Sequence, residues 1–303
     1  MSGSSAQRAG VAFAATAFLL WGLFPLYWKL LATVPALQVV AHRTAWGLAS
    51  VAVWVTWRRR WGEVRAAVSS TRTLLMLSAS AALIALNWLT YIWAVINDHV
   101  VESSLGYYIN PLVTVVLGVV VLGERLSRPQ VVAVGLAAAG VAILTVGHGR
   151  FPWIALVLAG TFGLYGLVRK TVAADAVIGL LVETAILTPV ALVFLAVAAA
   201  NGTGALGRDG AVVDALLVLS GAVTAVPLVL FTLGARRLPL STIGLIHYIA
   251  PSCQFLLAVL VFREPFTASH GAAFALIWAA LALLSWDLQR RMRGAIIVAP
   301  AGA

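Results

Sequence analysis

The sequence predicts an all-α polytopic membrane protein whose ten transmembrane helices form two inverted five-helix repeats. The first observation behind this prediction is the composition: 62% of the 303 residues are hydrophobic and only 10% are charged, whereas soluble domains carry about 25% charged residues. The second is that apolar runs of about 20 residues, the length that a helix needs to cross a bilayer, recur from end to end. The third is an internal repeat.

Ten apolar runs separated by short connections mark the expected helices. The first run is too long, and too rich in tryptophan, for a cleaved signal peptide. Residues 1–8 and 289–303 are expected to be tails, 9–146 the first repeat and 153–288 the second. In chain order we expect helices at 9–30, 34–57, 73–96, 101–122, 130–146, 153–168, 177–199, 212–235, 240–262 and 268–286.

The two halves match each other at a nearly constant spacing. Because each half has an odd number of helices, the second copy must lie upside down in the membrane. Inverted repeats of this kind place a pathway between the halves, near the midplane. The matching positions are Pro111 and Pro251, and Glu124 and Glu264, which are 140 residues apart, and Lys29 and Lys170, which are 141 apart.

Lysine and arginine are distributed unequally between the two sets of connections. With the N-terminus inside, fifteen of them lie on the cytoplasmic side and four on the outer side. Since cytoplasmic loops carry the excess of positive charge, both termini are expected in the cytoplasm of a bacterium, with the helices in its inner membrane.

The composition excludes several classes of function. The net charge of +10 is scattered between apolar runs, so no basic domain is available to bind nucleic acid. A single cysteine, Cys253, excludes an intramolecular disulfide and a cysteine-rich metal site. The motifs of P-loop nucleotide hydrolysis, of zinc proteases and of serine hydrolases are absent. We therefore expect no catalytic residues, metal or cofactor. If the protein transports a solute, the energy is expected to come from an ion gradient or from the gradient of the solute itself.

Two basic residues lie well inside the second predicted helix. Arg43 has three interpretations: it reaches the outer headgroups, it binds an anionic substrate, or it pairs with Glu102. His42 is either a proton relay, because the histidine pKa is near neutral, or a donor between helices. Charges at such depth are costly and commonly mark a pathway.

Other polar residues inside the predicted helices either line a pathway or hold helices together. Glu183 is interpreted as a proton carrier or as a hydrogen-bonding partner of a neighbouring helix. Pro111 and Pro251 each free a backbone carbonyl, which is tolerated where a helix lines a cavity. Glu124 and Glu264 are expected to form capping ion pairs in loops. The remaining candidates to line the pathway are Asn87, Tyr91, Glu102, Tyr107, Asn110 and His247.

Several motifs together resemble the RarD family, in the EamA branch of the drug/metabolite transporter superfamily. They include Ala41-His42-Arg43, VESSLGYYINPL at 101–112, LGERL at 122–126, YGLVRK at 165–170 and LSTIGLIHYIAP at 240–251. The resemblance implies a ten-helix permease, in a family whose name is tied to chloramphenicol sensitivity. Its polar motif residues fall on His42, Arg43, Asn87, Glu102, Asn110 and Glu183. His247 and Arg263 depart from the family pattern, which has glutamine and glycine there.

The residues and the resemblance together predict a secondary transporter that moves a small metabolite or drug-like solute by alternating access. Export is the expected direction, and His42 or Glu183 is the expected carrier of a coupling proton. The expected partners are the solute, H⁺ and the lipid bilayer. The alternatives are an importer or exchanger of the same fold, an intramembrane enzyme, and a membrane regulatory protein without flux.

Overall fold

The computed structural model describes residues 3–123, 125–148, 151–235, 237–238 and 240–298, and in these ranges the chain forms helices without any strand. The predicted all-α fold is confirmed for this part of the chain. The elements are α1 (Gly3–Lys29), α2 (Ala36–Trp57), α3 (Trp61–Ser69), α4 (Thr71–Ile96), α5 (Val100–Leu122), α6 (Arg128–His148), α7 (Trp153–Thr171), α8 (Ala176–Ala200), α9 (Ala211–Ala235), α10 (Leu240–His247), α11 (Ile249–Leu256), the π-helix η1 (Leu257–Val261) and α12 (Ala268–Val298).

Eight helices in the described ranges are long and apolar enough to cross a membrane, so the predicted count of ten is not confirmed. These eight are α1, α4, α5, α6, α7, α8, α9 and α12. The second predicted helix exists as α2, of 22 residues. Its buried polar residues lower its mean hydropathy; they are Gln38, His42, Arg43 and Thr44.

The ninth predicted helix is interrupted. α10 ends at His247, α11 begins at Ile249, and Pro251 follows within the first turn of α11. Proline at this position lacks an N–H and cannot continue an upstream hydrogen-bond ladder. Pro111, at the corresponding place in the first half, lies inside a helix that runs without interruption from Val100 to Leu122. The sequence also did not predict α3, which lies in the connection between α2 and α4.

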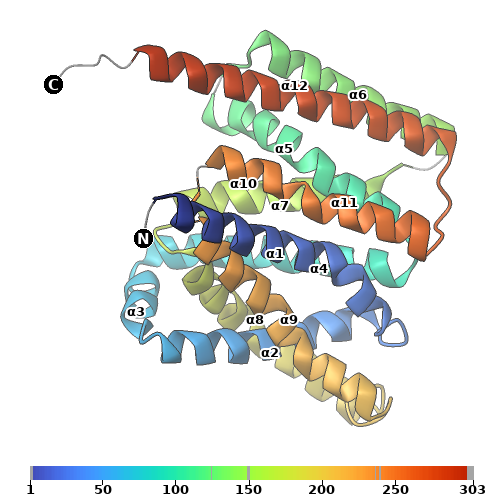
Figure 1. The fold of residues 1–303 in the computed structure, drawn as a ribbon. Coiled ribbons are helices and arrows are strands. Elements are labelled where there is room, and N and C mark those ends of the chain that lie inside the picture. Colours follow the sequence, from blue (N-terminus) through green and yellow to red (C-terminus); the bar gives the residue numbers. More distant parts are fainter. Residues whose placement is uncertain (1–2, 124, 149–150, 236, 239, 299–303) are drawn as a thin grey trace.

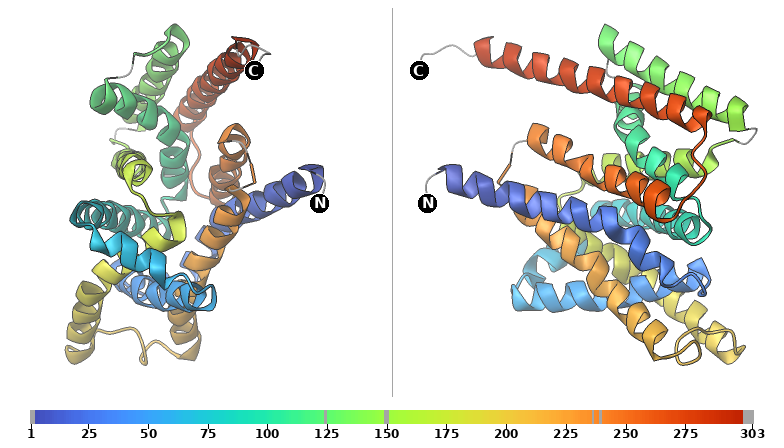
Figure 2. Two further views of the ribbon diagram at one scale, coloured as in Figure 1. Left: turned by 90° about the vertical axis from the view of Figure 1, so that its left-hand side faces the viewer. Right: turned by 45° about the vertical axis from the view of Figure 1, so that its right-hand side comes forward.

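The helices run roughly along one direction, with α6 and α12 side by side at one edge and α2, α8 and α9 toward the opposite edge (Figure 1). α5 and α7 pack together between these edges. α1 begins, α12 ends and α3 lies at the same end of the bundle, as both views of Figure 2 also show. This end is called the α3 end below. Its opposite, the far end, carries the connections between α4 and α5 and between η1 and α12.

Glycines bring the backbones of neighbouring helices into close contact. A Cβ atom on Gly221 of α9 would lie 2.2 Å from the carbonyl oxygen of Trp46 on α2, and one on Gly106 of α5 would lie 2.8 Å from that of Ala155 on α7. Small residues at helix crossings are typical of membrane proteins, where close packing replaces the hydrophobic effect between helices.

We expect Gly221→Ala to destabilise the protein by about 1–3 kcal/mol or more, because the added methyl group has no space at the α2–α9 crossing. The thermal midpoint of the detergent-solubilised protein measures the effect. Gly160→Ala on α7 is the matched control: a Cβ there meets nothing within 4 Å, and alanine is the better helix former. A wild-type midpoint for Gly221→Ala would contradict the close crossing.

Candidate functional site

Arg43 lies in a cage of aromatic rings. Its guanidinium carbon lies 4.1 Å from the ring centroid of Trp88 on α4, 5.1 Å from that of Trp28 and 6.0 Å from that of Phe24, the last two on α1. Only 5% of its surface is exposed. A guanidinium over aromatic faces is stabilised by cation–π attraction, and its planar shape suits stacking. α1, α2 and α4 therefore fix the orientation of this cation.

No carboxylate neutralises Arg43 within the described part of the chain. None of the ion pairs in this part of the chain includes Arg43, and Nε of Arg43 is buried without a hydrogen-bond partner. The alternative that Arg43 pairs with Glu102 finds no support, because the Glu102 carboxylate accepts a hydrogen bond from the backbone of α7. An unpaired charge at this depth is expensive to bury. The arrangement is suited to an anionic ligand.

Three further buried hydrogen-bond donors, on α1, α4 and α5, have no partner. They are Nε1 of Trp28, the hydroxyl of Tyr91 and Nδ2 of Asn110. The Tyr91 ring packs edge-on against Tyr107, with the ring centroids 5.7 Å apart, and Asn110 follows Tyr107 by one turn. Two of the three groups are N–H donors, which cannot accept a hydrogen bond. This excess of donors also favours a ligand that supplies acceptor oxygens.

Asn87 connects the Arg43 cage to α7. Its amide donates to Oγ1 of Thr161 at 2.9 Å and to the carbonyl of Leu158 at 3.1 Å, and its oxygen accepts from the hydroxyl of Tyr107 at 3.4 Å. Asn87 thus holds helices together and also positions Tyr107, whereas its role in lining a pathway stays a prediction.

Glu183 is completely buried in α8 and has partners on two other helices. Ser80 of α4 donates to Oε1 at 2.5 Å, and Tyr165 of α7 donates to Oε2 at 3.3 Å. Nε of Arg169, also on α7, lies 3.8 Å from Oε1. The Arg169 guanidinium covers Gly179, where a Cβ would lie 2.0 Å from Nη1. Gly179, one turn before Glu183, therefore leaves the space that the Arg169 guanidinium occupies beside the Glu183 carboxylate.

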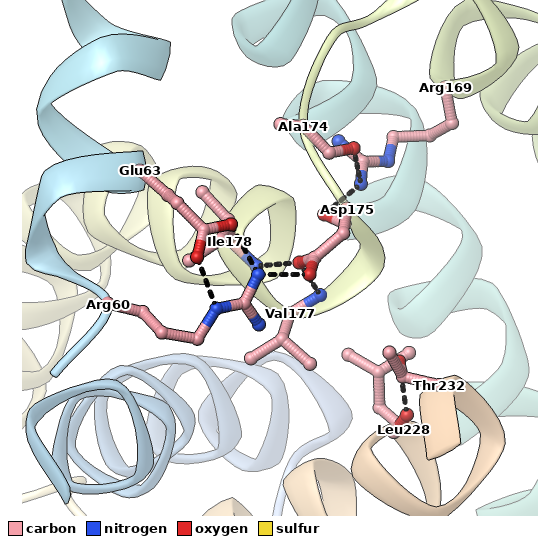
Figure 3. Close-up of polar contacts among 9 residues, drawn as sticks. All are labelled: Arg60, Glu63, Arg169, Ala174, Asp175, Val177, Ile178, Leu228 and Thr232. Atoms are coloured by element: carbon pink, nitrogen blue, oxygen red, sulfur yellow. Dashed lines mark hydrogen bonds and ion pairs between the residues drawn. The ribbon is translucent and has the colours of Figure 1, made fainter. Parts of the chain in front are cut away.

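A second polar network continues from Arg169 toward the α3 end (Figure 3). Nη2 of Arg169 donates to the carbonyls of Ala174 and Asp175, the latter at 2.7 Å. The Asp175 carboxylate caps the N-terminus of α8 by accepting from the amides of residues 177 and 178. Arg60 pairs with Asp175 and Glu63, and these hydrogen bonds raise the pKa of its guanidinium. The connection after α2 is thus tied to α8.

Two glutamates cap helices at the far end. Glu102 accepts from the amide of Ile154 at 3.1 Å, at the start of α7. Glu264 accepts from the amides of Val100 and Val101, both at 2.7 Å, at the start of α5. Carboxylates are favourable at helix N-termini, where free N–H groups point outward. Both acids therefore join neighbouring elements, and the capping partner of Glu264 is the backbone of α5 rather than Arg263.

Glu264 provides a prediction about pH. Burial raises the pKa of its carboxyl, against the opposing effect of the Val101 and Val100 amides. A raised pKa in the folded state means that its contribution to stability is greatest below the ordinary carboxyl pKa of about 4.3 and is lost as the pH rises through the folded value. We expect the thermal midpoint to fall as the pH rises above about 4.3, and to fall more steeply in wild type than in Glu264→Gln. Identical slopes would contradict the prediction.

The other predicted residues lie outside the Arg43 cage. His42 is buried on α2, and His247, at the end of α10, packs against the Phe18 ring at 5.1 Å. Lys29 pairs with Asp98 at the far end and lies over the Phe262 ring at 5.5 Å. Lys170 is exposed in the last turn of α7. Glu124 falls outside the described residues.

Sequence reasoning missed the partners of Glu183. The sequence does not distinguish Ser80 and Tyr165 as partners of Glu183, because single hydroxyls in apolar helices are common. Arg169 was counted only as a cytoplasmic charge, although its neighbourhood within YGLVRK was a motif of the resemblance.

Comparisons with known proteins agree with the resemblance in sequence. The model of the EamA-like transporter family matches residues 8–146. Protein RarD of Streptomyces exfoliatus is 45% identical over 97% of this chain and 93% of its own length. The chain belongs to the RarD family of the drug/metabolite transporter superfamily. A protein named "Uncharacterized transporter YojE" from Bacillus subtilis (strain 168) is 43% identical over 92% of this chain and 94% of its own length.

A solved crystal structure has the same fold, with a TM-score of 0.57 and 20% identity over 93% of this chain and 97% of the other. This likeness concerns the fold alone. The family and the eight apolar helices make this RarD-family chain a multi-pass membrane transporter of the inner membrane, with a small-molecule solute as its partner.

Proposed function

We propose that this RarD-family chain is a secondary transporter that exports a small amphipathic anion by alternating access, with Arg43 as the binding cation. The observation behind this proposal is the buried, unpaired guanidinium between Phe24, Trp28 and Trp88. The guanidinium and the unpaired donors would hold an acidic group, and the rings would contact the apolar body of the solute. The solute is thus the small metabolite or drug-like molecule that the sequence predicts, with the added requirement of negative charge.

We further propose ten membrane crossings as two inverted repeats, with α2 and the interrupted segment 240–261 as the additional crossings. Both have the length that a tilted helix needs, about 20 residues. Buried polar groups in α2 and a break in the second segment are typical of the crossings that form a transporter's site. The common location of the start of α1 and the end of α12 is what an even number of crossings requires.

The orientation follows from charge. The α3 end carries the arginines around the α2–α4 connection, which are Arg58, Arg59, Arg60, Arg65 and Arg72. We assign this end to the cytoplasm by the positive-inside rule, which places both termini there. The proposal of export rests on the resemblance to the RarD family, and the coupling ion we propose is a proton carried by His42 or Glu183.

Flux assays in proteoliposomes test the function. The probes are amphipathic monoanions, each with a neutral analogue as its matched control; benzenesulfonate and benzenesulfonamide form the best pair because sulfonate stays charged at every relevant pH. We expect protein-dependent flux of anions and at least about tenfold less flux of neutral analogues, since these leave the Arg43 charge unpaired. Equal flux of both members of each pair, or no flux of any anion, would contradict the proposal.

A further inference from the structure

We infer that Glu183 is the proton-binding group of this chain, and that its protonation frees the positive charge of Arg169 and thereby strengthens anion binding at Arg43. This inference rests on the proposed function, since it assigns the coupling ion of the same site. It chooses between the two candidates, His42 and Glu183, and gives the sign of the coupling.

The partners of Glu183 are compatible with both of its protonation states. A hydroxyl can donate to a carboxylate and can turn to accept from a carboxylic acid. Ser80 and Tyr165 each place a hydroxyl on one carboxyl oxygen. The Arg169 guanidinium, at 3.8 Å, also has the carbonyls of residues 174 and 175 as acceptors. Neutralising Glu183 therefore leaves the carboxyl group and Nη2 of Arg169 with their hydrogen bonds, while Nη1 of Arg169 is buried without a partner.

The buried glutamates at the far end provide the contrast. The acceptor oxygens of Glu102 and Glu264 face backbone N–H groups at the starts of α7 and α5. Those groups are donors only and cannot turn, so a proton on the carboxyl would remove an acceptor from a fixed donor. Of these three acids, only Glu183 has surroundings that reorganise with its protonation state.

Packed side chains connect Glu183 to the Arg43 cage. The Tyr165 ring packs on Phe162 at 5.9 Å, and Phe162 packs on Tyr107 at 6.0 Å. Tyr107 in turn contacts Tyr91 and bonds to Asn87. Coupling between distant sites requires a contiguous physical connection of this kind. Along α4, Ser80 at Glu183 and Trp88 at Arg43 are eight residues apart, which corresponds to about 12 Å.

Arg169 is the charged group that acts on Glu183. α2, α3, α4 and α9 pack against α8, and α7 reaches it through the side chains of Tyr165 and Arg169. The groups from these elements that act on the Glu183 carboxyl are Arg169, Ser80 and Tyr165. The other titratable or charged groups on or beside these elements include His42, Arg43, Arg58, Arg59, Arg60, Glu63, Arg65, Arg72, Tyr91, Lys170, Asp175 and Asp214. Of these, Asp175 is already shared between Arg60 and the start of α8.

The sign of the coupling follows from the charges. With Glu183 ionised, the Glu183–Arg169 pair has no net charge; with Glu183 protonated, the pair carries +1. One positive charge added about 12 Å from the anion, at an effective dielectric constant of about 20, strengthens anion binding about tenfold.

Because the couplings are reciprocal, anion binding also favours the protonated form of Glu183. Proton and anion are then carried together, as an electroneutral symport. Net export occurs when the outward gradient of the solute exceeds the inward gradient of protons.

Two measurements test this inference on the full-length protein. Infrared difference spectra between about pH 5 and about pH 9 should show the C=O band of a protonated carboxyl group that is lost in Glu183→Gln. Tyr165→Phe keeps the ring and removes the hydroxyl, so it should retain this band and displace its titration midpoint. Glu102→Gln, the matched control, should retain the band unchanged.

The second measurement is the affinity for benzenesulfonate as a function of pH. Wild type and Glu102→Gln should bind about tenfold more tightly at the acid limit. Glu183→Gln imitates the protonated form and should bind with the acid-limit affinity at every pH. If Glu183 had a purely structural role, Glu183→Gln would instead bind benzenesulfonate more weakly than wild type.

The outcomes separate the inference from the proposed function. A carboxyl band or a tenfold pH dependence that persists in Glu183→Gln would overturn the inference and leave the anion site intact. Absence of benzenesulfonate binding at every pH would overturn both the anion site and its coupling to Glu183. Loss of the band in Glu183→Gln would then still assign the proton to Glu183.

Discussion

Arg43→Leu is expected to abolish anion transport while the protein remains at least as stable as wild type. The guanidinium is buried between three aromatic rings with no carboxylate to neutralise it. Loss of a buried charge that contacts an anion weakens binding by at least about thirtyfold. An unpaired buried cation does not repay the cost of its desolvation, so leucine should remove that cost and raise or preserve the thermal midpoint.

Arg58→Leu is the matched control, because Arg58 also lies over a tryptophan ring, that of Trp57, at 5.7 Å, but follows the last residue of α2. We expect it to transport as wild type does. Arg43→Lys keeps the charge without the planar group that stacks on rings, and it should give intermediate transport. A large loss of stability in Arg43→Leu, with transport intact, would make Arg43 a structural residue and would overturn the proposed site.

The sequence predicted the helices well because apolar length is a local property. All ten predicted runs correspond to helical segments, with an interruption in the ninth. The count of crossings was less certain for a physical reason. α2 carries polar residues of the proposed site, and these lower the hydropathy by which a crossing is recognised. The residues of the proposed site therefore obscure the topology.

The sequence identified Arg43, Asn87 and Glu183 as polar residues within helices but not their partners. Sequence spacing places residues on a face of their own helix, whereas the partner of Glu102 lies on α7 and that of Glu264 on α5. The role of Trp28 and Trp88 was similarly hidden, because a tryptophan in an apolar run also suits lipid or packing. Only the packing of α1, α2 and α4 brings these rings to the cation.

Arg169→Gln is expected to destabilise the protein by about 3 kcal/mol or more, because it leaves Glu183 as a buried carboxylate without its counter-charge. The variant also loses the hydrogen bonds from Arg169 to the carbonyls of Ala174 and Asp175. Glu183→Gln alone should cost about 1 kcal/mol, because Arg169 keeps those two acceptors and Ser80 keeps an oxygen to bond.

The double variant Arg169→Gln/Glu183→Gln distinguishes charge from packing. If the single Arg169 variant is unstable because it leaves a buried charge, removing that charge should recover most of the lost stability, and the two effects should be strongly non-additive. Arg208→Gln is the control for loss of an exposed ion pair, since Arg208 pairs with Asp209 at the surface, where such pairs contribute little. Additive losses in the double variant would mean that Arg169 acts through its carbonyl contacts alone. Glu183 would then not depend on Arg169 for its charge, and the sign of the proposed coupling would have no physical basis.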